Sequence, residues 1–140
     1  MILDFEKIIS DIVSLCELSR ETHVLEVGPG LGSITYPISE QTDHLTCIEI
    51  DRGLAGYLKE NITNAEIVNC DFLKYECKDK PEVVVSNIPY YVMTDIMKKI
   101  FGEYSGARKM VFMVEDEAIA RIDCGPNTKQ YGPLAMLCFL

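Results

Sequence analysis

Hydrophobic and polar positions change their period along the chain, and these changes predict alternating strands and helices. Apolar residues recur at helical spacing from Phe5 to Cys16, directly after Asp4, a residue suited to cap a helix. Short apolar runs then alternate with amphipathic stretches. Strands are expected at 24–27, 45–50, 67–68, 83–85 and 110–114, and helices at 33–41, at 53–62 and after a cap at Thr94.

Alternation of strands and helices is typical of a parallel sheet with helices on both of its faces. We therefore predict an α/β fold with five parallel strands. The 140 residues fit one domain, and no repeat at solenoid spacing divides them. A single domain over residues 1–140 is expected.

Composition adds mainly exclusions. Hydrophobic residues make up 48% and charged residues 25% of the chain, as in ordinary globular proteins. No apolar run approaches the ~20 residues of a transmembrane helix, and the first residues do not resemble a secretory signal, so a cytoplasmic location is expected. The six cysteines contain no C-x-x-C pair and only two histidines accompany them. We expect reduced, buried thiols and no metal site.

The net charge of −9 is unevenly distributed. Residues 1–51 hold ten acidic and two basic side chains, and residues 52–140 hold twelve and eleven. The composition therefore does not indicate the strongly basic face that nucleic-acid binding usually needs. An RNA partner would be met by local clusters, although a solvated position is the simpler interpretation of each residue alone. The available residues are Lys98, Lys99, Arg108, Lys109, Arg121 and Lys129.

A glycine-rich loop follows the strand at 24–27. Gly28, Gly30 and Gly32 alternate where a strand turns into a helix, the position at which open α/β sheets bind ligands. The third glycine comes one residue earlier than in the dinucleotide fingerprint, and Ser33 takes the last position. Glu26, just before the loop, would repel a pyrophosphate but attract the ammonium group of a methionine moiety.

Acidic residues follow the next two strands. Glu49 lies about 20 residues after the glycines, where a carboxylate can accept hydrogen bonds from both ribose hydroxyls in nicotinamide and S-adenosylmethionine sites alike. Asp51 is a second candidate for this role, but it more simply caps the following helix. Asp71 could accept from an adenine amino group, with Phe72 beside the base. By itself, Asp71 is equally typical of a turn.

The segment Asn87-Ile88-Pro89-Tyr90 comes directly after the strand at 83–85. The side-chain oxygen of Asn87 and a backbone carbonyl, with Ile88 as the candidate, can accept both hydrogens of an amino group and turn its lone pair toward an electrophile. Pro89 stiffens the loop, and Tyr90 offers a face on which a base can stack. A proline turn with a core tyrosine would be the simpler interpretation of this segment alone, but here it follows a glycine loop and two acids in order.

Together these segments resemble the catalytic domain of the rRNA adenine N6,N6-dimethyltransferases of the KsgA type, relatives of the Erm resistance methyltransferases. The matching segments are 24–35, 48–51, 71–74 and 87–90, and the stretches 113–121 and 129–134 are more similar to the KsgA side. The resemblance covers nearly the whole chain. It implies a Rossmann-like class I methyltransferase fold, with S-adenosylmethionine across the carboxyl ends of the first three strands.

The resemblance also implies a role for each matching residue. Asn87, Pro89 and Tyr90 would receive an adenine of small-subunit rRNA, flipped out of its stack, as catalytic residues. Two direct displacements at the sulfonium methyl would give dimethyladenine, with positioning and desolvation doing most of the catalytic work and no strong base required. The cofactor-binding residues would be Glu26, Gly28, Gly30, Glu49, Ile50, Asp71, Phe72 and Asn87.

The chain also departs from the family pattern. Relatives carry a basic N-terminal arm, which we expect to be absent here. Residues 115–117 are all acidic, whereas relatives often have a basic residue in this stretch. We expect a truncated catalytic core that ends within a helix, lacks the last two strands of the sheet and the helical RNA-binding domain, and is inefficient on rRNA. The strand at 110–114 would then be an apolar sheet edge, which predicts self-association into a homo-oligomer.

Other functions stay open at this point. A nicotinamide-dependent oxidoreductase explains the glycines and Glu49, but it leaves residues 87–90 unused, and neither a Tyr-x-x-x-Lys motif nor a catalytic histidine is evident. A second alternative is a non-catalytic S-adenosylmethionine-binding fragment. An Erm-like enzyme acting on large-subunit rRNA is a close variant, and residues 131–134 are the feature against it.

Overall fold

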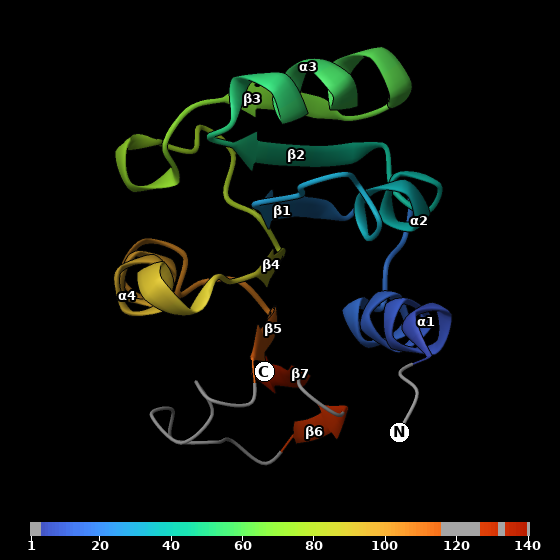
Figure 1. Ribbon diagram of the computed structural model, residues 1–140, viewed down its shortest axis with the longest axis vertical. Helices are drawn as coiled ribbons and strands as arrows, with labels where there is room; N and C mark the ends of the chain where they lie inside the picture. The colour runs from blue at the N-terminus through green and yellow to red at the C-terminus, as the bar shows by residue number, and fades with distance from the viewer. Residues whose placement is uncertain (1–3, 116–126, 132–133, 140) are drawn as a thin grey trace.

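The computed structural model describes residues 4–115, 127–131 and 134–139, with Tyr90 and the residues from Glu115 onward described by their backbone alone. One sheet of seven strands runs through the molecule in the order β3-β2-β1-β4-β5-β7-β6 (Figure 1). Strands β1 to β5 are parallel, and β7 is antiparallel to both β5 and β6. The strands are β1 (His23–Val27), β2 (His44–Glu49), β3 (Glu66–Asn69), β4 (Val83–Asn87), β5 (Lys109–Glu115), β6 (Asn127–Tyr131) and β7 (Leu134–Phe139).

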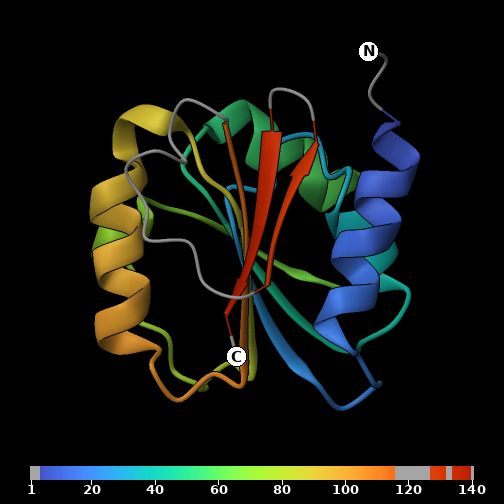
Figure 2. The ribbon, with the colours of Figure 1, turned by 90° about the horizontal axis from the view of Figure 1, so that it is seen from below.

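Helices cover both faces of the parallel part of the sheet, as Figure 2 shows from below with α4 on one side and α1 on the other. The described helices are α1 (Phe5–Cys16), α2 (Thr35–Ser39), α3 (Arg52–Asn61) and α4 (Met93–Glu103), with the 3-10 turns η1 (Phe72–Lys74) and η2 (Tyr90–Val92). The expected α/β architecture and its five parallel strands are confirmed. Helix α2 is shorter than the expected 33–41 because the glycine loop continues to Ile34.

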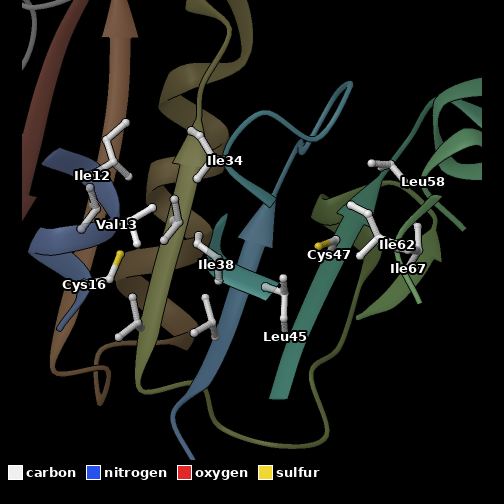
Figure 3. Close-up of a cluster of buried hydrophobic side chains, with 14 of the residues drawn as sticks. Ile12, Val13, Cys16, Ile34, Ile38, Leu45, Cys47, Leu58, Ile62 and Ile67 are labelled. Carbon is white, nitrogen blue, oxygen red and sulfur yellow. The ribbon is translucent and has the colours of Figure 1, made fainter. Parts of the chain in front are cut away.

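Two hydrophobic cores lie on opposite sides of the sheet, because successive residues of a strand point to opposite faces. Val24 of β1 belongs to the first core, with α1, α2 and α3, whereas Leu25 and Val27 belong to the second, with α4 and η1. Figure 3 shows the first core, where side chains of α1 lie toward β5 and those around α3 meet side chains of β2 and β3. Full burial of each such aliphatic side chain contributes roughly 1.5–3 kcal/mol.

Three helix-capping residues were expected from the sequence, and the structure confirms two of them. Asp4 accepts a hydrogen bond from the Lys7 amide at 3.0 Å, and Asp51 accepts one from the Leu54 amide at 2.9 Å, so both caps are confirmed. The expected cap at Thr94 is wrong. Helix α4 follows directly from the turn η2, with Val92 in the cap position and no side-chain cap, because buried Met93 starts the helix against the second core.

The expectation that the sheet stops at β5 is also wrong. Strand β7 pairs with β5 from Met110↔Phe139 to Glu115↔Leu134, and β6 pairs with β7 in turn. Residues 134–139, expected within a helix, are six apolar residues after Gly-Pro, and periodicity alone cannot separate a strand from a helix over so short a run. Since β5 has neighbours on both sides, the predicted self-association through its free edge loses its basis.

Candidate functional site

The loops after β1, β2, β3 and β4 meet at the carboxyl edge of the parallel strands, and hydrogen bonds connect them. The Gly28 amide, just after β1, donates to the Ile48 carbonyl of β2 at 2.9 Å. The Ser86 hydroxyl of β4 donates to the Val27 carbonyl at 2.9 Å. The Asn87 carbonyl oxygen lies 3.8 Å from the position that a Cβ would take at Gly28. The glycine loop and the end of β4 are therefore direct neighbours.

The glycine loop needs glycine for its backbone shape. Gly28, Gly30 and Gly32 have φ values of +72°, +60° and +90°, which other residues rarely adopt. A Cβ at Gly32 would come within 3.0 Å of Leu58 Cδ2, so this glycine also allows close packing on α3. At Gly30 a Cβ would meet nothing within 4 Å. The middle of the loop is therefore open for a ligand to approach its backbone.

Glu49 is buried at the end of β2, with 5% of its surface exposed, and it joins two loops. Its Oε1 accepts from the Gly30 amide and its Oε2 from the Asp51 amide, each at 3.0 Å. A carboxylate offers about four acceptor positions, so two backbone bonds leave capacity for ribose hydroxyls. Glu49 thus fixes the glycine loop against the start of α3 and can still bind a ligand.

Asn69, at the end of β3, is a site residue that the sequence analysis missed. Its side-chain amide donates to the carbonyls of Glu49 at 2.9 Å and of Ile50 at 3.2 Å. The Ile50 side chain itself is 69% exposed. Asn69 holds the backbone that presents Glu49 and Ile50. Its only sequence signal is a polar amide at the end of the third strand.

Glu26 is buried beneath the glycine loop with 2% of its surface exposed. Its Oε1 accepts from the Thr35 hydroxyl at 2.6 Å and from the Cys47 thiol at 3.6 Å. Burial raises the pKa of Glu26 from 4.5 to about 7; these two hydrogen bonds lower it and the charge of Glu49 adds to the rise. The Glu26 carboxyl therefore has partners within the protein, and Thr35 and Cys47 were not foreseen in that role.

Asp71 and Phe72 occupy different environments after β3. Asp71 is half-buried, and its Oδ1 accepts from the Leu73 amide at 3.0 Å at the start of η1, so it does take the turn role that the sequence made equally possible. The Phe72 ring is 5% exposed in the second core, with its centroid 6.1 Å from that of Tyr104 and 5.1 Å from Lys99 Nζ. Because this large ring packs in the core, it does not lie at the open edge where we expected it.

The segment after β4 is anchored at one residue and exposed on both sides of it. Ile88 is buried at 1% exposure, and its amide donates to the Met113 carbonyl of β5 at 3.0 Å. Asn87 and Pro89 are exposed, and the Pro89 carbonyl accepts from the Val92 amide at 3.2 Å. Tyr90 begins η2, and its side chain lies outside the described atoms. The segment thus presents Asn87 and Pro89 at the same edge as the glycine loop.

Of the basic residues considered for RNA contacts, three are engaged within the protein. Their ion pairs are Lys99–Glu103 at 3.4 Å, Arg108–Glu82 at 3.8 Å and Lys109–Glu17 at 3.1 Å. Lys98 is exposed on α4, Lys129 lies on β6, and Arg121 lies outside the described residues. The described part of the chain therefore does not gather these cations into one basic face.

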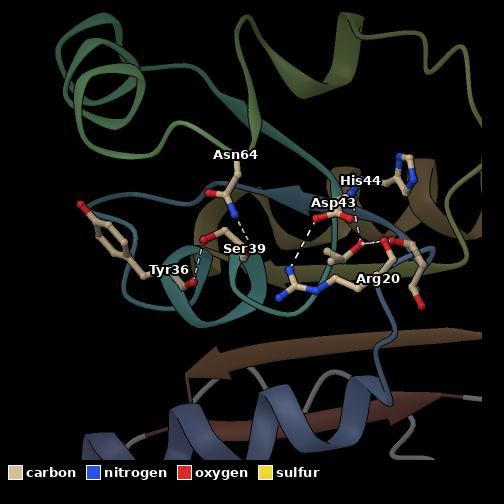
Figure 4. A network of polar contacts seen from close by, with 8 residues as sticks. Arg20, Tyr36, Ser39, Asp43, His44 and Asn64 are labelled. Carbon is tan, nitrogen blue, oxygen red and sulfur yellow. Dashed lines mark hydrogen bonds and ion pairs between the residues drawn. The ribbon is translucent and has the colours of Figure 1, made fainter.

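A cavity of about 630 Å³ opens at the opposite, amino edge of the sheet. There the rings of His23 and His44 stack with centroids 4.4 Å apart. Figure 4 shows the neighbouring polar network, in which Arg20 pairs with Asp43 at 3.4 Å. Among the described residues that line this cavity, none belongs to the expected site. We place the site at the carboxyl edge because ligands of parallel sheets bind where the loops leave the strands.

Within residues 4–115 and the two described C-terminal strands, no group of three or more His, Cys, Asp or Glu side chains is arranged to hold a metal ion. None of the helices in the described part of the chain is long and apolar enough to cross a membrane.

Comparisons with known proteins agree with this geometry. The family model of ribosomal RNA adenine dimethylase matches residues 2–139. Ribosomal RNA small subunit methyltransferase A of Alkaliphilus metalliredigens is 34% identical over 142 residues, which cover 94% of this chain and 50% of that protein. The chain thus spans about half the length of the curated relatives it matches.

Solved structures show the same fold. The 23S rRNA methyltransferase ErmE superposes with a TM-score of 0.76 at 32% identity, covering 91% of this chain and 52% of that one. An RNA methyltransferase from Salinibacter ruber, solved in complex with S-adenosyl-L-homocysteine, gives a TM-score of 0.79 at 15% identity, with 96% and 90% covered. These likenesses confirm the expected Rossmann-like methyltransferase fold.

Proposed function

Because the chain belongs to the ribosomal RNA adenine dimethylase family, we propose that it is a catalytic domain that transfers methyl groups from S-adenosylmethionine to N6 of adenine in small-subunit rRNA, two per adenine. The observation that carries the proposal is the proximity of the glycine loop to the end of β4, where the Asn87 carbonyl oxygen lies 3.8 Å from the position that a Cβ would take at Gly28. A cofactor held on the glycine loop therefore has its reactive end beside the segment suited to hold an amino group. An rRNA substrate is consistent with the expected cytoplasmic location.

The residues of the carboxyl edge fit S-adenosylmethionine in chemistry. Glu49 keeps free acceptor positions for ribose hydroxyls, and its carboxylate is already oriented by two amides. The open backbone at Gly30, with Gly28 beside it, suits the methionine portion. Ile50 is 69% exposed and offers an apolar surface for the adenine ring. These four residues form the main part of the proposed cofactor site.

The remaining proposed cofactor residues act from the border of this surface. Asp71 uses one oxygen to hold η1, and its other oxygen remains as an acceptor for the adenine amino group. Phe72 supports Asp71 from the core rather than by contact of its ring with the base. Glu26 lies under the loop, and its negative charge favours the cationic methionine portion. Asn87 borders both the cofactor and the substrate.

In the proposed reaction, the bound cofactor supplies an electrophilic methyl group on a sulfonium. Asn87 accepts a hydrogen bond from the adenine amino group and holds its nitrogen, while Pro89 limits the motion of the loop. Tyr90 stacks on the flipped-out base. Buried Ile88 keeps the segment fixed to β5, so that positioning, rather than a general base, provides most of the acceleration. The proton leaves N6 to water after the transfer.

Calorimetric titration with S-adenosylmethionine, with NAD as the competing ligand, tests the cofactor half of this proposal. We expect the wild-type chain to bind S-adenosylmethionine, Glu49→Ala to lose at least about tenfold in affinity, and Glu60→Ala, an exposed acid at the end of α3, to bind as the wild type does. Binding of NAD alone would overturn the proposal.

Transfer of labelled methyl groups to a small-subunit rRNA fragment tests the catalytic half. Asn87→Ala should lower transfer by a larger factor than it lowers cofactor affinity. Cofactor binding with no transfer to small-subunit or large-subunit RNA would mean a cofactor-binding module without this activity. Transfer to large-subunit RNA alone would assign the chain the substrate of an Erm-like enzyme.

A further inference from the structure

A buried hydrogen bond closes the base of the glycine loop. Thr35, the first residue of α2, donates its hydroxyl to Glu26 Oε1 of β1 at 2.6 Å, and both residues are at most 2% exposed. Glu26 precedes the loop and Thr35 follows it. The bond therefore joins the two ends of the segment that the proposed cofactor must contact.

We propose that Thr35 is a positioning residue of the cofactor site: through its bond to Glu26 it holds a negative charge under the glycine loop and so sets how tightly the loop binds a cationic cofactor. This inference rests on the proposed function, because it assumes that the loop binds S-adenosylmethionine. It adds a residue whose hydroxyl acts on the cofactor through another side chain.

The surrounding contacts leave this task mainly to Thr35. Ile34, in the cap position before α2, makes no side-chain cap bond. Two backbone bonds lead from the loop into the helix, from the Gly32 amide to the Pro29 carbonyl and from the Tyr36 amide to the Gly32 carbonyl, each at 3.0 Å. The Cys47 thiol also donates to Glu26 Oε1, but at 3.6 Å and as a weak donor. The Thr35 hydroxyl is thus the strong donor in this buried cluster.

The neighbours of Glu26 act on its ionisation in opposite directions. From β2 the titratable groups that face it are Cys47 and Glu49, whereas α2 contributes Thr35 and β4 places Val85 in register beside it. Burial raises the pKa of Glu26 to about 7, and the Thr35 bond lowers it. Removal of the Thr35 hydroxyl should therefore raise this pKa further and leave Glu26 mostly neutral at neutral pH.

The sign of the pH effect follows from linkage. A cationic ligand binds better when Glu26 is ionised, so cofactor affinity should increase as the pH rises through about 7 in the wild type. In Thr35→Val the increase should move to higher pH, with affinity at neutral pH reduced by up to about tenfold for each pH unit of displacement. Thr35→Ser keeps the hydroxyl and should retain the wild-type profile.

Titration calorimetry of S-adenosylmethionine across this pH range, with Thr35→Val and the matched Thr35→Ser, is the decisive measurement. The proposal predicts a displaced pH profile for the valine variant and an unchanged one for the serine variant. A purely structural Thr35 would lower the melting temperature of the valine variant and leave the midpoint of its pH profile in place. That outcome would overturn the proposal.

A second measurement separates this inference from the proposed function. The carboxyl signal of Glu26 in the ligand-free protein, assigned by its loss in Glu26→Gln, can be titrated by NMR without any cofactor. Thr35→Val should raise its midpoint, and Cys47→Ala, which removes the weaker donor, should raise it by less. If the Glu26 midpoint is unchanged in both variants, the proposed action of Thr35 on Glu26 is overturned, even if the cofactor binds. If the midpoint is raised but the wild type binds no cofactor, the proposed function is overturned, and with it the proposed effect of Thr35 on cofactor affinity.

Discussion

Replacing Glu26 by glutamine should make the folded protein more stable at alkaline pH. Glu26 is a buried carboxyl whose described partners are neutral donors, the Thr35 hydroxyl and the Cys47 thiol. Glutamine keeps the size of the side chain and an oxygen that can accept from Thr35, but it carries no charge. The substitution therefore removes the cost of burying an ionised carboxylate and retains the main hydrogen bond.

The magnitude follows from the pKa of Glu26. Folding raises this pKa from 4.5 to about 7, so the folded state holds a proton that the unfolded state has released over that interval. The contribution of Glu26 to stability is fully present below pH 4.5 and is lost as the pH rises through 7. At about 1.4 kcal/mol per pH unit, the loss amounts to about 3 kcal/mol.

Urea unfolding of the wild type and of Glu26→Gln, followed by circular dichroism from acidic to alkaline pH, measures this difference. The free energy of unfolding of the two proteins should be similar near the lower end of the interval. It should diverge by about 3 kcal/mol in favour of glutamine above it. Other titrating groups affect both proteins alike, so a difference that stays constant with pH would refute the reasoning.

Three further predictions concern stability. Gly32→Ala should lower the free energy of unfolding by about 1–3 kcal/mol, because the φ of this residue is +90° and a Cβ there would meet Leu58. Gly56→Ala in α3, where a Cβ would meet nothing within 4 Å, should raise it by about 0.5–1 kcal/mol. Thermal unfolding of both variants tests this pair, and equal effects would contradict it. Asn69→Ala should lower the free energy of unfolding in urea by about 1–3 kcal/mol, since it leaves the carbonyls of Glu49 and Ile50 without their amide donor. It should also weaken S-adenosylmethionine binding, and unchanged binding would remove Asn69 from the site. Asp4→Ala should lose about 1 kcal/mol through its cap without any change in cofactor affinity.

Much of the fold could be predicted because its signals are local. The cap at Asp4 and the apolar spacing that follows define α1 from within one segment of sequence. Glu49 and Asn87 could be placed at one edge without knowledge of any contact, since both end parallel strands whose carboxyl ends meet at that edge.

The parts that could not be predicted depend on contacts between distant segments. The partners of Glu26 are Thr35 and Cys47, and Asn69 binds the backbone after β2; no spacing rule connects these positions. The hairpin of β6 and β7 was missed for a different reason. A six-residue apolar run fits either a strand or a helix, and only its pairing with β5 decides between them.

The two backbone bonds to Glu49 have a consequence for the rate of ligand capture. Since the Gly30 and Asp51 amides each hold one oxygen, the carboxylate is pre-organised before any ligand arrives. A ligand then avoids the roughly 0.5–1.5 kcal/mol that immobilising a free side chain costs. Association should accordingly proceed in a single kinetic phase, and variants of the surrounding residues should differ mainly in how long the complex survives.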